Sequence, residues 1–192
     1  MNKMKNLRCF FLPLWILCTG IFIIACSNDE NKELTKDEVV VDNDIPLNYN
    51  NLSVSYQLLN KDSIPVRSFK EGENIVFQLK ITNNRDSAIS LPLIPDIIGD
   101  DAFMVYTSDG KVIGKPWKSF SIITARHPRL QVQHSLTFDV PWLEGTVRPD
   151  LCFSEWGNQP PLAKGSYYTQ FPIALDMNSD RKVLCRKEFV VK

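Results

Sequence analysis

Residues 130–140 read Leu-Gln-Val-Gln-His-Ser-Leu-Thr-Phe-Asp-Val, and every even-numbered residue except His134 is apolar. Alternation with a period of two predicts a half-buried β-strand, because successive side chains of a strand point to opposite faces. His134 falls on the apolar face, and we interpret it as a core histidine rather than a metal ligand. The stretch therefore predicts a strand that packs one face against a core.

Shorter runs of the same character lie on both sides of this stretch. The strands expected in addition to 130–140 are 52–58, 75–81, 88–93, 102–107, 111–114, 120–124, 167–175 and 183–191. Polar turns separate them, and Asp109-Gly110 readily adopts the positive φ values of a tight hairpin. No stretch after residue 50 shows a sustained helical period. Eight or nine short strands predict an all-β fold, an antiparallel immunoglobulin-like β-sandwich. A closed barrel is the alternative.

The N-terminal 25 residues have the layout of an export signal. Residues 1–8 carry three positive charges, and residues 9–25 are almost wholly apolar. The run ends in Ile23-Ile24-Ala25-Cys26, which resembles the bacterial lipobox. This resemblance implies cleavage before Cys26 and lipidation of its thiol. The alternative is an uncleaved anchor, since 17 mostly apolar residues approach the length that spans a bilayer.

An acidic segment follows Cys26. Residues 27–48 contain seven acidic side chains and two lysines, so we expect residues 26–50 to form a disordered tether. The acidic cluster is similar to the signal that exports lipoproteins of Bacteroidota to the outer face of the outer membrane. The alternative is a solvated spacer that leaves the domain facing the periplasm. The expected organisation is a signal peptide (1–25), a tether (26–50) and one domain (51–192).

Charge and motif content exclude several classes of function. The first 25 residues hold three of the 22 basic side chains and no acid, so 19 basic and 22 acidic groups remain after cleavage. This balance gives no reason to expect nucleic acid as a partner. The two histidines, His127 and His134, lack the paired spacing of a zinc site, and we expect no metal and no cofactor. The sequence holds no nucleophile elbow or P-loop, and we expect no enzyme; an unrecognised hydrolase is the third-ranked alternative.

Two cysteines, Cys152 and Cys185, lie beyond the leader and Cys26. In an exported chain two cysteines are able to close one disulfide. The alternative is a pair of reduced, buried thiols that pack as small apolar groups.

Tryptophans occur on connections between the expected strands. Residues 152–161 read Cys-Phe-Ser-Glu-Trp-Gly-Asn-Gln-Pro-Pro and place Trp156 beside Asn158 and Gln159. Trp117 follows a proline on another connection. Tryptophans flanked by amide side chains are typical of carbohydrate or protein contact surfaces. We predict a binding loop at Trp156, Asn158, Gln159 and Trp117; the alternative is that these tryptophans cap the core.

Two triplets, Asp62-Ser63-Ile64 and Asp86-Ser87-Ala88, occur at expected turns. Both are similar to the acceptor motif for O-glycosylation in Bacteroidota. The similarity implies that Ser63 and Ser87 carry glycans.

A series of short motifs runs through the expected sandwich. Residues 69–77 read Phe-Lys-Glu-Gly-Glu-Asn-Ile-Val-Phe, and Ile-Thr-Asn follows at 81–83. Next come the turn 109–111, the run 136–142 from Leu136-Thr137-Phe138 to Trp142, and Lys-Gly-Ser-Tyr-Tyr at 164–168. In this order the motifs resemble the immunoglobulin-like BsuPI-type domains, a family named after a bacterial intracellular proteinase inhibitor. The resemblance spans residues 52–175.

The resemblance implies the sandwich fold and, as an alternative function, proteinase inhibition. Lys164 stands where the family has proline, and no Pro-Gly-Glu precedes the stretch 130–140. No reactive-site residue is matched. From the sequence we therefore expect a non-enzymatic, membrane-anchored lipoprotein whose single β-sandwich serves binding or envelope assembly, with an unknown protein or glycan ligand.

Overall fold

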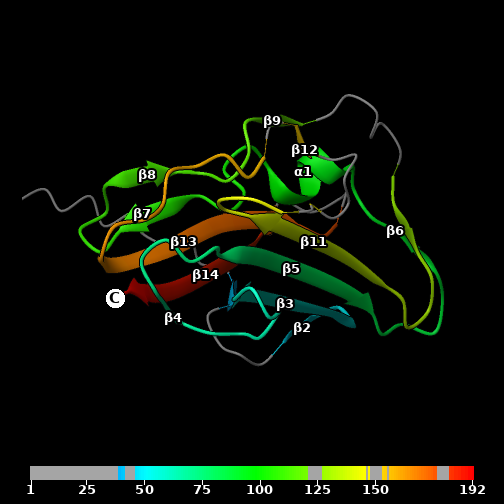
Figure 1. Cartoon of the computed structure of the whole chain (residues 1–192). Helices are drawn as coiled ribbons and strands as arrows, with labels where there is room; N and C mark the ends of the chain where they lie inside the picture. Colours follow the sequence, from blue (N-terminus) through cyan, green and yellow to red (C-terminus); the bar gives the residue numbers. More distant parts are fainter. Residues whose placement is uncertain are drawn as a thin grey trace, which may run out of the picture. The chain divides into compact units, whose positions relative to one another are not determined.

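The computed structural model describes residues 39–41, 46–120, 127–145, 147, 153–154, 156–176 and 182–192. Two main β-sheets dominate this part of the chain (Figure 1). The first, called here the β13–β14 sheet, has the strand order β1-β14-β13-β7-β8, and β4 also pairs with β14. Its strands are β1 (Val39–Val41), β4 (Ser68–Phe69), β7 (Val105–Thr107), β8 (Val112–Gly114), β13 (Gly165–Ala174) and β14 (Lys182–Val191).

The second main sheet, called here the β3–β5 sheet, is antiparallel throughout, with the order β11-β5-β3-β2. Its strands are β2 (Leu47–Tyr49), β3 (Leu52–Leu59), β5 (Val76–Asn83) and β11 (Ser135–Pro141). Two small ladders complete the described strands: β6 (Ile89–Ser90) with β10 (Arg129–Leu130), and β9 (Ser119–Phe120) with β12 (Phe153–Ser154). The short helix α1 spans Ile94–Ile98.

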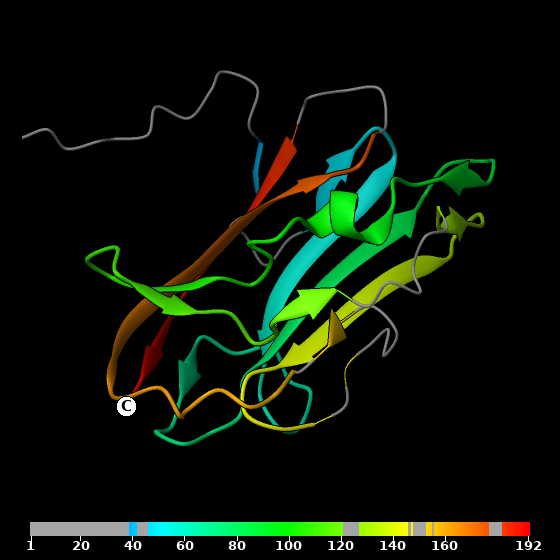
Figure 2. The ribbon, with the colours of Figure 1, turned by 90° about the horizontal axis from the view of Figure 1, so that it is seen from above.

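An aromatic core lies between the two main sheets. Tyr56 of β3 meets Phe171 of β13 edge-on, with ring centroids 5.1 Å apart, and Phe103 lies 4.9 Å from Phe171. These edge-to-face contacts join one sheet to the other across the core. Figure 2 shows the two sheets as separate layers. The all-β sandwich that the sequence predicts is confirmed.

The first strands lie earlier in the chain than the expected domain start at residue 51. β1 pairs in parallel with β14, Val39 opposite Val183, and β2 pairs with β3, Leu47 opposite Val54. Both segments lie within the range 26–50 that we expected to be a tether. Three consecutive valines in β1 have high strand propensity, which the acidic content of the surrounding segment hides in a composition-based prediction.

The alternation in residues 130–140 predicts one strand, but the structure has two strands separated by a turn. β10 ends at Leu130, residues 131–134 turn, and β11 begins at Ser135. Gln133 has a φ of 59°, and both Val132 and His134 are exposed. The prediction of a core histidine at position 134 is therefore wrong, because this turn breaks the strand and directs His134 to solvent.

Asn83 explains the turn. Its side chain is fully buried at the end of β5, and Nδ2 donates to the carbonyl oxygens of Ser87, Leu130 and Gln131 at 2.9, 3.1 and 3.2 Å. Oδ1 accepts from the backbone N–H of Arg85 at 3.0 Å. The amide thus pairs with backbone groups of two segments, the one that follows β5 and the one at the end of β10. Such backbone groups must be paired when they are buried.

The backbone of Asn83 pairs with the same turn. Its N–H donates to the carbonyl of His134 at 3.0 Å, and its carbonyl accepts from Gln133 N–H at 2.8 Å. Two hydrogen bonds therefore close the turn onto the last residue of β5. From Ser135 onward, β11 then pairs with β5 in regular register, Ser135 opposite Thr82 and Pro141 opposite Val76.

Replacing Asn83 with alanine tests this role. Asn83→Ala leaves three carbonyl groups and one N–H without their partner, and the bond to Leu130 is buried, so we expect the free energy of unfolding to fall by on the order of 3 kcal/mol. Urea unfolding monitored by circular dichroism measures the change. The neighbouring Asn84 is exposed, and Asn84→Ala should stay within about 0.5 kcal/mol of the parent. Equal effects of the two substitutions would contradict the role of Asn83.

Candidate functional site

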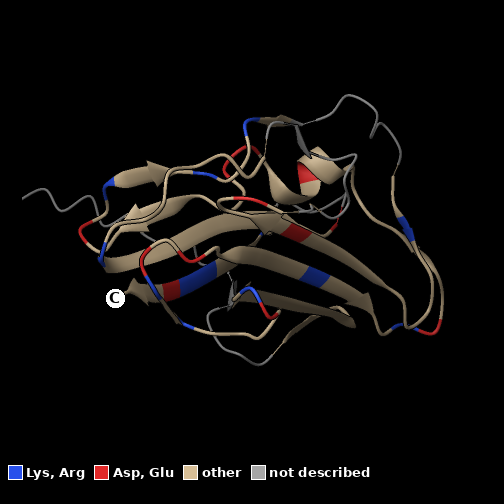
Figure 3. Ribbon diagram, viewed as in Figure 1, with Lys and Arg blue, Asp and Glu red and all other residues tan. Residues whose placement is uncertain are grey.

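A row of polar and aromatic side chains crosses the outer face of the β13–β14 sheet. Strand register places Tyr168 of β13 between Tyr106 of β7 and Glu188 of β14. One step along, Gln170 lies opposite Arg186. Side chains alternate between the two faces of a strand. The residues adjacent to these five pack into the core, so the five themselves point away from it. Figure 3 shows acidic and basic positions side by side on β14.

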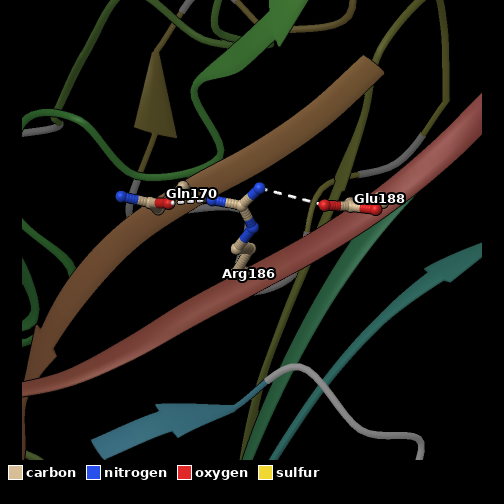
Figure 4. A network of polar contacts seen from close by, with 3 residues as sticks. All are labelled: Gln170, Arg186 and Glu188. Carbon is tan, nitrogen blue, oxygen red and sulfur yellow. Dashed lines mark hydrogen bonds and ion pairs between the residues drawn. The ribbon is translucent and has the colours of Figure 1, made fainter. Parts of the chain in front are cut away.

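Arg186 is held by contacts on both sides. Nη1 donates to Oε1 of Gln170 at 3.0 Å, and Nη2 donates to Oε1 of Glu188 at 2.9 Å (Figure 4). The side chain of Arg186 is 35% exposed and that of Glu188 is 64% exposed. An ion pair this exposed contributes at most about 1 kcal/mol to stability. Its main effect is to fix the direction of the guanidinium group.

Aromatic stacking fixes the same group from a third direction. The rings of Tyr106 and Tyr168 are stacked, with centroids 4.9 Å apart and an interplanar angle of 11°. The guanidinium carbon of Arg186 lies 4.6 Å from the centroid of the Tyr168 ring. A cation over an aromatic ring is worth roughly 0.5–1 kcal/mol at an exposed site. Tyr106, Tyr168 and Arg186 thus form one ordered stack across three strands.

Partial burial also affects the phenol of Tyr106. Burial raises its pKa above the ordinary value, and the nearby carboxylate of Asp101 and the ionisable phenol of Tyr168 raise the pKa further. Tyr106 therefore keeps its hydroxyl proton at neutral pH and is able to donate a hydrogen bond.

A groove of about 370 Å³ lies beside this stack. Its polar lining residues are Arg67, Ser108, Ser166, Tyr168, Arg186 and Glu188. We call it the outer-face groove. Its volume falls within the roughly 300–1,000 Å³ of small-molecule sites. The groove combines hydroxyl, guanidinium and carboxylate groups with an aromatic ring, a mixture suited to binding a polar ligand.

A second polar group of residues lies inside the core. The hydroxyl oxygens of Tyr56 and Thr169 are 3.0 Å apart and buried, and Cys185 and Lys187 are buried on the inward face of β14. Burial raises the pKa of Tyr56 well above 10.0, and the bond to Thr169 partly offsets this rise. Burial likewise raises the pKa of the Cys185 thiol, against a smaller lowering by the charge of Lys187. In its reduced form, Cys185 is therefore a protonated thiol rather than a reactive thiolate.

Trp117 does not belong to a surface loop. It is 1% exposed, and its indole N–H donates to the carbonyl of Ala102 at 2.9 Å. Trp142 is equally buried and donates to the carbonyl of Pro160 at 2.8 Å. Both rings fill the core, and each indole N–H finds a backbone acceptor there, as buried tryptophans require. The prediction that Trp117 lines an exposed binding loop is therefore wrong.

The other predicted loop residues lie beside the connection that carries Trp117. Trp156 is half-buried against the core, Gln159 is half-buried, and Asn158 is exposed. The N–H of Gly157 donates to the carbonyl of Pro116 at 3.1 Å. Gly157 has a φ of 66°, and a Cβ there would lie 3.3 Å from the carbonyl oxygen of Leu143. The loop is closely packed, and its role in binding stays a prediction.

Two sequence predictions remain: that His127 and His134 bind no metal, and that Cys152 and Cys185 form a disulfide. His127 is exposed, and its Nδ1 lies 3.0 Å from the carbonyl oxygen of Leu91. The described residues contain no group of three or more His, Cys, Asp or Glu side chains that could hold a metal ion. Cys185 is a free, buried thiol within that part of the chain. Cys152 lies outside the described residues, and the disulfide stays a prediction.

The modification sites expected from the sequence are accessible where the structure describes them. Ser63 and Ser87 are both exposed. Ser63 has a φ of 59° in a turn that Asn60 closes by accepting from the N–H groups of Asp62 and Ile64. The proposed acceptor of lipid, Cys26, lies outside the described residues. Within those residues, no helix combines the length and the apolar character needed to cross a membrane.

No protein-family model matches this chain, and no curated protein matches it. Among solved structures, the C-terminal domain of wzt is similar at a TM-score of 0.37 and 10% sequence identity, over 76% of each chain. A likeness at this level adds nothing to the account of the site.

The residues of the outer-face groove are not apparent from the sequence as a site. Tyr168 and Gln170 occupy the outward positions of the predicted strand 167–175, and Arg186 and Glu188 those of 183–191. A sequence signal exists in these outward positions, since aromatic and charged residues cluster there. Their neighbourhood depends on strand register, which the pattern alone does not fix.

The buried phenol of Tyr56 predicts a pH dependence of stability. The unfolded chain releases the proton near pH 10.0, whereas the folded chain retains it to a higher pH. Above pH 10.0 the unfolded state thus binds fewer protons, and stability falls by up to about 1.4 kcal/mol per pH unit. We expect Tyr56→Phe to be less stable at neutral pH, because Thr169 loses its partner, but to show a flatter decline in alkaline urea unfolding. Equal slopes for parent and variant would contradict the assignment.

Proposed function

We propose that this chain is a non-enzymatic lipoprotein that displays a ligand-binding β-sandwich on the cell envelope. The observation that carries the binding role is the outer-face groove with its ordered Arg186. A guanidinium group fixed by Gln170, Glu188 and Tyr168 enters a complex with little loss of side-chain entropy, and such preorganisation increases affinity. The groove supplies donors, acceptors and an aromatic ring in one place.

The proposed attachment rests on the sequence before the sandwich. An apolar run of 17 residues ends at the small residue Ala25, immediately before Cys26. A lipid on Cys26, followed by an acidic segment, would place the sandwich at the surface of the outer membrane. A single acyl chain holds a protein only weakly, so stable attachment needs more than one chain on the anchor.

Cys26→Ser tests the anchor. We expect the substitution to abolish incorporation of a labelled fatty acid and to release the chain from the membrane fraction. Fractionation with immunoblotting and metabolic labelling measure both effects, and Cys18→Ser within the leader is the matched control. A Cys26→Ser chain that remains in the membrane like the parent would support an uncleaved anchoring helix instead.

Binding through the outer-face groove is tested with the full-length chain in nonionic detergent, immobilised on a sensor. The probe is a water-soluble extract of the cell envelope. We expect Arg186→Ala to weaken retention of the extract by about tenfold, which corresponds to about 1.4 kcal/mol. Lys80 is an exposed cation on β5 of the other sheet, and Lys80→Ala should bind like the parent. A parent chain that retains nothing would contradict the binding function.

A further inference from the structure

We infer that the outer-face groove binds a saccharide through two neighbouring hydroxyl groups. This inference rests on the proposed binding function and names the class of its ligand. Hydrogen-bonding capacity remains at the groove beyond the contacts that its side chains make within the protein.

Arg186 retains three N–H donors without a protein partner. A guanidinium group has five N–H donors, and Gln170 and Glu188 each accept one. Within the described parts of the chain, the other three have no acceptor. The guanidinium group is planar, so the free donors lie in its plane, and its carbon lies 4.6 Å from the centroid of the Tyr168 ring. Their direction is set before any ligand arrives.

Acceptors lie directly beside these donors. Glu188 uses Oε1 for Arg186, and Oε2 has no partner among the described residues. The hydroxyl groups of Ser108 and Ser166 also line the groove, and neither residue has a side-chain hydrogen bond in the described chain. A ligand that both donates and accepts at adjacent positions satisfies this surface. Neighbouring hydroxyls of a saccharide do so, because each hydroxyl is a donor and an acceptor.

The charge around Arg186 does not favour a simple anion there, although Arg67 also lines the groove. The carboxylate of Glu188 lies 2.9 Å from the guanidinium group of Arg186 and balances its charge. A second carboxylate or a phosphate bound to the same guanidinium would stand close to Glu188 and be repelled by it. A ligand with hydroxyl groups gains the hydrogen bonds without this repulsion.

The position of the groove also disfavours an extended peptide. Peptides commonly bind a sheet by adding a strand to an unpaired edge. The groove lies over β13 and β14, and the part of β13 beside it pairs with β14 on one side and with β7 on the other. The register pairs of β14 with β1 end at Cys185, and those with β4 begin at Val190. The backbone groups of β13 are engaged in its ladders, so recognition over this strand depends on side chains. The ring of Tyr168 then offers an apolar edge to the C–H groups of a sugar.

A glycan array tests the inference with the full-length chain in nonionic detergent. The array carries neutral and acidic oligosaccharides, each also after mild periodate oxidation, which cleaves the carbon–carbon bond between neighbouring hydroxyl-bearing carbons. We expect binding to untreated saccharides and loss of binding after oxidation. Arg186→Lys keeps the charge but loses the planar fork, and we expect at least about tenfold weaker binding. Glu188→Gln should weaken binding similarly, and Lys80→Ala should not.

Thermal unfolding of each variant shows whether the sandwich remains folded. Three results would overturn the inference: no binding to any saccharide, binding that survives periodate, or binding that requires a saccharide carboxylate and persists in Glu188→Gln. The envelope extract separates this inference from the proposed function. If protease treatment of the extract abolishes retention and periodate does not, the groove binds a protein: the binding function holds and the saccharide is excluded. If untreated extract is not retained, the binding function itself fails.

Discussion

The buried amide of Asn83 is the constraint on which one end of the sandwich depends. It joins the end of β5 to the turn at Ser87 and to the carbonyls of Leu130 and Gln131, and its own backbone closes the turn at 131–134. A buried amide whose hydrogen bonds are all made stabilises the fold, whereas the same buried amide with half of its partners would destabilise it. This one side chain therefore decides where the small β6–β10 ladder ends and where β11 starts its regular pairing with β5.

The candidate site depends on register in the other sheet. Tyr106 comes from β7, which is distant in sequence from β13 and β14, and it forms one row with Tyr168 and Glu188 because β13 pairs with both β7 and β14. Interior strands of a sheet shift little, since a slip of one residue would move every buried side chain of β13 and β14 to the wrong face. The core on the inner side thereby supports the geometry of the outer side, and the groove needs no long loop to hold it in place.

Period-two patterns predicted the long strands well, because each buries one apolar face: 52–58, 75–81 and 183–191 correspond closely to β3, β5 and β14. The same reasoning failed at Val132 and His134, since alternation does not reveal that Asn83 captures the carbonyls of Leu130 and Gln131. The prediction at Trp117 came from its place on a connection between strands, and it is wrong because a backbone carbonyl in the core satisfies the indole N–H. The sequence does not predict the groove, because its residues occupy ordinary outward positions of their strands. Only the strand register determines that they are neighbours. Lys187 is an exception to the pattern, because a lysine occupies an inward, buried position of β14 where the alternation predicts an apolar residue.

The parallel pairing of β1 with β14 has a mechanical consequence. Val39–Val41 is the first described strand, and its register partners are Val183, Leu184 and Cys185. A protein held at its N-terminal side under flow would receive the pull at β1, and the short ladder to β14 would bear the load before β2 or β3. The register pairs that bear it end one residue before Arg186. Tension on the chain from its N-terminal side would therefore act on the strand that carries Arg186.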